Sequence, residues 1–268
     1  MAYKIPSYIP KTDSKINYSW DDNMIDEMLD YDYAKSVCDK LLNISLRAKI
    51  ALNIGVYEWV LAYLGELSDK AEPYQVVEAA WCANINKYYI YYMEFDHNEY
   101  IGPIDGPLWC GLTSVVLSLY VSENIADVEN LDKYEYEDQQ LYGGNDDYAE
   151  IGLMGNISLA LYILPDNQTQ LFKKWFENIS ERFIQLYFMP EEDEYSNLFG
   201  YNSEKDWLGD YVPREALDPK KNYQPSETRL LSKDFLQDVD YKENPYLVPP
   251  EELIGRVKKP YWKSEKTI

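Results

Sequence analysis

Two tryptophan-cysteine pairs are the first residues in this chain whose types could do chemistry. Trp81-Cys82 precedes Trp109-Cys110 by 28 residues, and the second pair ends the stretch GPIDGPLWCG (102–111). Zinc takes four ligands from cysteine, histidine and carboxylates, but the chain has one histidine and no C-x-x-C motif. We therefore predict that Cys38, Cys82 and Cys110 are reduced, bind no metal and pack as small apolar side chains.

The single histidine, His97, stands between Asp96 and Glu99, and a nearby carboxylate can make an imidazole a better base. Its polar neighbours instead favour an exposed loop. The motifs G-x-S-x-G, G-x-x-x-x-G-K-[ST] and G-x-G-x-x-G do not occur, which argues against a hydrolase triad and against bound ATP or dinucleotides. We predict no catalytic residue and no cofactor. An enzyme with carboxylate chemistry in a helical cleft stays as an alternative.

The charge of the chain indicates what kind of partner it could have. Its formal net charge is −22 over 268 residues, yet 46% of the residues are hydrophobic and 27 are tyrosines, which is typical of a folded protein. Such a surface repels nucleic acids and anionic membranes and attracts basic proteins. The first residues lack the apolar core of a signal peptide, and no apolar run reaches 18 residues. We expect a cytoplasmic protein without a membrane segment.

Residues 123–148 are the candidate partner-binding segment. Lys133 is their only basic residue, and the pair Gly143-Gly144 interrupts them, so we expect a largely exposed loop, with or without a short helix. At an interface, buried tyrosines can supply much of the binding energy, while carboxylates set the rate at which the two proteins associate. The tyrosines and acidic residues that we expect to contact the partner are Tyr134, Glu135, Tyr136, Glu137, Asp138, Tyr142, Asp146, Asp147 and Tyr148. A solvated acidic loop without a partner is the alternative interpretation.

Helices must position these residues, and we predict an all-α fold. Residues 42–67 are apolar on nearly every side, which predicts a buried central helix with Asn43 or Ser45 as its cap. Residues 73–86 and 106–124 each begin near a proline, which suits a first helical turn and predicts that Trp81 and Trp109 are buried. We expect KYYIYYMEF to prolong the first of these helices, either continuously or after a break.

Two more helices complete the predicted compact domain, residues 1–189. Residues 149–165 form an apolar helix that Pro165 ends, and the next helix, capped by Asp166 or Asn167, reaches about Tyr187. Its apolar face comprises Trp175, Phe176, Ile179, Phe183 and Leu186.

Residues 190–268 form a long irregular tail in this prediction. Proline and charge are too dense there for long helices, although SKDFLQDVD and the stretch after Pro250 suit short ones. Large apolar residues recur throughout the tail, so we expect it to dock on the helical core. These residues are Trp207, Leu230, Leu231, Phe235, Leu236, Tyr246, Leu247 and Trp262.

The stretches VEAAWCANI, GPIDGPLWCG, VPREALDP and NPYLVPPEELIG resemble an uncharacterised family of bacterial helical proteins. By type, an acidic helical chain without a catalytic motif also resembles the immunity proteins that neutralise antagonistic toxins, including type VI and Rhs toxins. This resemblance implies that the protein binds a basic toxin domain and occludes its active site. An adaptor protein of a secretion apparatus is a further alternative.

Overall fold

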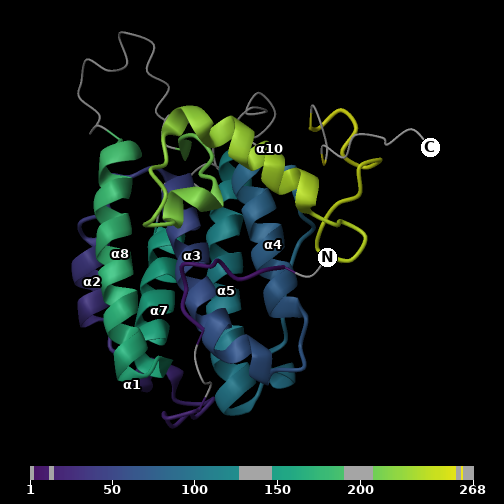
Figure 1. The fold of residues 1–268 in the computed structure, drawn as a ribbon. Helices are drawn as coiled ribbons and strands as arrows, with labels where there is room; N and C mark the ends of the chain where they lie inside the picture. The colour runs from purple at the N-terminus through teal and green to yellow at the C-terminus, as the bar shows by residue number, and fades with distance from the viewer. Residues whose placement is uncertain (1–2, 12–14, 127–146, 190–207, 258–260, 262–268) are drawn as a thin grey trace, which may run out of the picture.

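The computed structural model describes residues 3–11, 15–126, 147–189, 208–257 and 261, without the side chains of 120–126 and 147. The protein is all-α, as predicted, and five long helices stand side by side in it (Figure 1). No helix among the described residues is both long enough and apolar enough to cross a membrane.

Helix α3 (Leu46–Leu64) is the central helix, as predicted. Nearly all of its side chains are buried, and three of these are polar or charged: Lys49, Asn53 and Glu58. Ser45 occupies the N-cap position, although its side chain makes no capping hydrogen bond. Because α3 contacts α4, α5, α7 and α8, each polar group inside it must find its partner on another element.

Helices α5 (Gly102–Ala126) and α7 (Asp147–Ile163) pack closely against each other and against α3. Glycines allow this approach. A Cβ atom on Gly152 would lie 2.6 Å from the backbone oxygen of Ser114, and one on Gly111 would lie 2.4 Å from the ring of Tyr57. Helix α7 begins two residues before the predicted segment 149–165 and ends before Pro165.

Both Gly-Pro pairs of the stretch GPIDGPLWCG lie inside α5, so this helix begins four residues before the predicted residue 106. Pro107 has no N–H group, and the carbonyl that it would have bonded in a helix is that of Pro103. The hydroxyl of Tyr18 donates to this carbonyl instead. The backbone N–H of Gly102 donates to Asp22 Oδ2 at 2.9 Å. Distant side chains therefore complete the first turns of α5.

Helix α4 (Glu72–Ile85) ends one residue before the predicted segment 73–86 does, and KYYIYYMEF does not prolong it as an α-helix. The Asn86 side chain accepts from the Tyr88 N–H and starts a short 3-10 turn, Lys87–Tyr89. The chain then runs extended, and Ile90 pairs antiparallel with Leu247. Backbone bonds join Tyr91 N to Tyr246 O and Val248 N to Tyr89 O, each at 2.9 Å.

Helix α8 (Asp166–Leu186) has the apolar face that its sequence predicts. Trp175, Phe176, Ile179 and Phe183 are buried, and Leu186 is half-buried against the core. The predicted caps are wrong, because Pro165 holds the N-cap position and Asp166 is already the first helical residue.

Residues 208–257 lie against the helices through backbone as well as side-chain contacts. Arg182 on α8 donates to the carbonyls of Ala216 and Asp218 at 2.8 Å and of Lys221 at 3.0 Å. The Trp175 indole donates to Leu217 O at 3.0 Å. The boundary predicted between residues 189 and 190 adjoins residues 190–207, which lie outside the described part of the chain, as does Trp262.

The tail contains one of the two short helices predicted for it. Helix α10 (Thr228–Asp238) includes most of SKDFLQDVD and begins four residues before it. The stretch after Pro250 instead forms successive turns, in which Glu252 N donates to Pro249 O and Leu253 N to Pro250 O. Leu236 and Leu247 are buried, whereas Leu230 is exposed, so the apolar residues of the tail do not all pack inward.

Candidate functional site

Most of the predicted partner-binding segment lies outside the described residues. This holds for Tyr134, Glu135, Tyr136, Glu137, Asp138, Tyr142 and Asp146. Asp147 and Tyr148 do not belong to a loop, because they are the first two residues of α7. Tyr148 is 42% exposed, and Ile151, one turn later on α7, is 49% exposed.

A second acidic surface was not anticipated from the sequence. It comprises residues 21–32 around two short helices, α1 (Ile25–Met28) and the start of α2 (Asp32–Cys38). Six acidic residues and no basic residue occur in this stretch, and that run was the signal by which it could have been found. The exposed members are Asp21, Asp26, Glu27, Asp30 and Asp32, with Met24 and Tyr31 also exposed.

Buried contacts hold this acidic surface on the helical core. Leu29, Ala34 and Val37 are buried, and α2 packs along α7. Asp22 accepts from the Trp20 indole at 2.8 Å through one carboxylate oxygen and from the first N–H of α5 through the other. A carboxylate at a helix N-terminus is favoured by the helix dipole. The exposed carboxylates therefore project from an anchored backbone.

His97 adjoins the same region but does not face the carboxylates that flank it in sequence. Its ring stacks on Trp109, with centroids 4.3 Å apart, and its Nε2 lies 3.9 Å from Asp22 Oδ1. Asp96 instead accepts from Asn98 N. Trp109 is only half-buried and donates to Phe95 O, so the prediction that it is buried is wrong, while Trp81 is buried as predicted.

The three cysteines are free thiols, two of them buried. Burial, with Asp22 and Asp26 nearby, raises the pKa of the Cys110 thiol to about 12. Burial likewise raises the pKa of Cys38 to about 12. Near neutral pH both are protonated and weakly nucleophilic. No group of three or more histidine, cysteine or acidic side chains among the described residues is placed to hold a metal ion.

Among the described residues, the carboxylate most removed from water is that of Glu58, in the middle of α3. Arg214 Nε donates to its Oε1 at 3.0 Å, the Trp81 indole does so at 3.0 Å, and the Tyr3 hydroxyl also bonds this oxygen. Tyr8 donates to Oε2 at 3.3 Å. Burial, then the charge of Glu58, raises the pKa of both tyrosines well above the usual range, so they remain donors. Four donors from three segments of the chain thus occupy this carboxylate.

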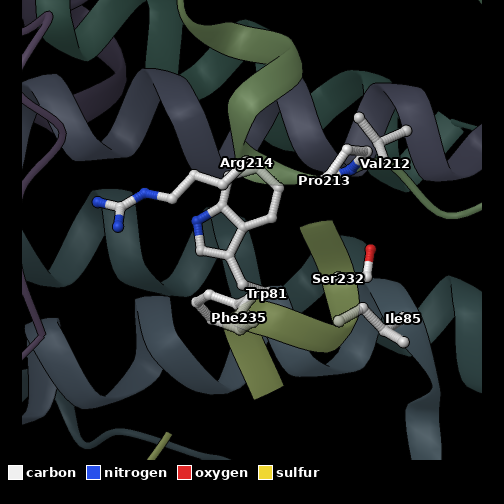
Figure 2. Close-up of a pocket in the computed structure, with 7 residues that line it drawn as sticks. All are labelled: Trp81, Ile85, Val212, Pro213, Arg214, Ser232 and Phe235. Atoms are coloured by element: carbon white, nitrogen blue, oxygen red, sulfur yellow. The ribbon is translucent and has the colours of Figure 1, made fainter. Parts of the chain in front are cut away.

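A small cavity lies beside this cluster, between α4 and α10 (Figure 2). Its volume is about 10 Å³, about the space that one water molecule needs. Trp81 and Phe235 form part of its wall, and the Arg214 guanidinium points away from Ser232 (Figure 2). The dimensions do not suit an organic substrate. The Glu58 cluster therefore acts as a structural tie between the tail and the central helix.

The Ser232 hydroxyl in this wall is buried and has no hydrogen-bond partner among the described residues. We expect Ser232→Ala to raise the free energy of unfolding by about 0.5–1 kcal/mol, because alanine is the better helix former and no hydrogen bond is lost. Urea denaturation measures this. The matched control is Ser118→Ala, since that buried serine donates to Val115 O at 2.6 Å. A Ser232→Ala protein less stable than the Ser118→Ala protein would contradict the prediction.

No protein-family model matches the chain, and searches of curated proteins and of solved structures find no match to it.

Proposed function

We propose that this protein is a cytoplasmic binding protein, not an enzyme, that neutralises a basic toxin domain by occluding its active site. The observation that carries the proposal is the concentration of uncompensated negative charge. The chain has a net charge of −22, and within the described surface residues 21–32 expose five carboxylates without one basic residue. A field of this sign accelerates association with a basic protein by about 10- to 1,000-fold.

Exposed tyrosine side chains near the charges support slow dissociation of a bound partner. Tyrosine buries a large ring and keeps its hydroxyl hydrated, and it is enriched among the residues that dominate interface energies. Tyr31 and Tyr148 are exposed in this setting. The tyrosines of residues 134–148 would add to them. Nucleic acid is not expected as a ligand, since the phosphates would be repelled.

Association kinetics with the basic product of a neighbouring gene, or with a basic partner isolated by pull-down, test the proposal. Neutralising Glu135, Glu137, Asp138, Asp146 and Asp147 should slow association and flatten its dependence on salt, since exposed charges act over about 8 Å at physiological ionic strength. The Tyr136→Ala and Tyr142→Ala variants should mainly dissociate faster.

Two outcomes would contradict different parts of the proposal. Unchanged rates in the neutralised variant would remove residues 134–148 from the interface. Expression of the chain that fails to protect cells from the neighbouring toxin would remove the immunity function itself.

A further inference from the structure

The side chain of Tyr261, near the C-terminus, fills a slot that earlier segments of the chain build. Its ring tilts against the ring of Tyr89 and stacks on that of Tyr241, with centroids 5.1 Å apart in both pairs. Its hydroxyl donates to Val248 O at 2.9 Å, and the residue is only 3% exposed. Tyr89, Tyr241 and Val248 O, which we call the tyrosine slot, therefore hold both the ring and the hydroxyl of an aromatic residue.

Backbone contacts that do not involve Tyr261 hold the slot together. Ile90 pairs antiparallel with Leu247, and Val248 N donates to Tyr89 O at 2.9 Å. Tyr89 is itself buried against the core. Because these bonds join two walls of the slot directly, the slot is already formed for an incoming ring, and a preformed site costs little ordering when a ligand binds.

The backbone of Tyr261 is strained. It is the only non-glycine residue of the described chain with a positive φ, +32°. A side chain in this region of φ crowds the backbone, and such a residue persists only where its surroundings offset the strain. The contacts of the ring and the hydroxyl do so here. Departure of Tyr261 from the slot would relieve the strain, so this contact is weaker than that of an unstrained tyrosine.

Tyr261 belongs to the most basic stretch of this acidic chain. Among residues 256–266 five are basic and one, Glu265, is acidic; the basic ones are Arg256, Lys258, Lys259, Lys263 and Lys266. The Arg256 guanidinium lies over the ring of Tyr88, 5.8 Å from its centroid. Two residues of the basic stretch therefore contact successive tyrosines of the turn Lys87–Tyr89.

Carboxylates lie on the segments that build the slot. The Asn244 side chain donates to Gln75 O at 2.8 Å and to Glu78 Oε2 at 3.0 Å, which places Glu78 of α4 beside the stretch that contains Val248. Glu251 and Glu252 follow in the next turn and are exposed. Negative charge attracts a basic ligand. The surroundings thus favour an aromatic residue that stands among lysines or arginines.

We infer that residues 256–268 are an autoinhibitory segment: Tyr261 occupies the tyrosine slot, and an aromatic residue of the basic partner takes the same slot when Tyr261 leaves it. The inference rests on the proposed function for the identity of the partner. The chain's own segment has the advantage of being tethered, since a linker keeps its effective concentration high. A partner must therefore displace Tyr261 before it binds the slot.

The test adds residues 256–268 as a separate, fluorescently labelled peptide to the full chain. Fluorescence anisotropy measures the Kd. The peptide should bind the Tyr261→Ala chain at least about tenfold more tightly than the unaltered chain, because only the variant leaves the slot open to a second ring. The peptide that carries Tyr261→Ala, and a scrambled peptide of the same composition, should each bind that variant at least about tenfold more weakly than the native peptide.

Further variants of the full chain identify the slot as the binding place. Adding Tyr241→Ala to Tyr261→Ala removes one wall and should weaken the peptide at least about tenfold. The Tyr261→Phe chain keeps the ring and loses only the hydroxyl that bonds Val248 O, so it should bind the peptide about threefold more tightly than the unaltered chain. This conservative variant keeps the test decisive if Tyr261→Ala does not fold.

The matched control is Tyr92→Ala, which removes a tyrosine close to the slot in sequence but 68% exposed. It should bind the peptide as the unaltered chain does, within about twofold. Equal affinity of the peptide for the unaltered chain and for both Tyr261 variants would overturn the inference. So would equal affinity of the native and scrambled peptides for the Tyr261→Ala chain.

The basic partner, from pull-down or from the neighbouring gene, then separates this inference from the proposed function. It should bind the Tyr261→Ala chain at least about threefold more tightly than the unaltered chain, and the peptide should compete with it. A partner that binds both chains equally and is not displaced by the peptide would overturn the autoinhibition and leave the proposed function standing. Failure of every basic protein tested to bind either chain would overturn both.

Discussion

Replacement of Arg214 by alanine is expected to lower the free energy of unfolding by about 3–5 kcal/mol, because it leaves a buried carboxylate without its cation. The Glu58 side chain is fully buried, whereas Arg214 is 20% exposed. The guanidinium also lies over the Tyr3 ring, 4.5 Å from its centroid, and bonds Lys4 O. Its loss therefore loosens the N-terminal segment and the tail together.

Urea denaturation followed by tryptophan fluorescence measures this effect. The control is Arg229→Ala, an exposed arginine in α10 whose removal should change stability by less than about 0.5 kcal/mol. Adding Glu58→Gln to the Arg214→Ala variant should restore part of the loss, because the neutral amide still accepts from Trp81 and Tyr3 without burying a charge. Equal losses in the Arg214 and Arg229 variants would show that the pair does not stabilise the fold.

The substitution Gly152→Ala is expected to destabilise the protein by about 1–3 kcal/mol, even though alanine is the better helix former. The new methyl group would lie 2.6 Å from the backbone oxygen of Ser114, so α5 and α7 must move apart. Backbone atoms cannot rotate away as the end of a side chain can.

The same substitution three residues later provides the control. A methyl group on Gly155 meets only the Ser114 hydroxyl, at 3.3 Å. Gly155→Ala should therefore be neutral or stabilise by up to about 1 kcal/mol through helix propensity. Thermal and urea denaturation of the two variants compare them directly. A Gly152→Ala protein as stable as the Gly155→Ala protein would mean that the helices accommodate the methyl group without strain.

The five long helices could be predicted from the sequence because their signals are local. The apolar residues of 42–67 cover nearly all sides of a helix, which indicates a central position. Trp175, Phe176, Ile179 and Phe183 recur at the spacing of one helical face. Hydrogen bonds in a helix join residues four apart, so a window of residues contains most of what determines it.

Where a helix starts and where the chain becomes extended depended on distant residues. Tyr18 accommodates Pro107 within α5 by bonding the Pro103 carbonyl, and Leu247 pairs with Ile90 where a longer helix had been expected. Tyr18 and Leu247 are distant in sequence from the segments that they contact. Neither contact can therefore be recognised from the residues next to those segments.

The same distinction separates the parts of the candidate site. Composition alone indicated the acidic character, on which the proposal of a basic partner rests, since net charge does not depend on how the chain folds. Only the tertiary structure joined Glu58 to Arg214, 156 residues away. Pairing of charges and packing of faces are set by distances in space, which local periodicity does not encode.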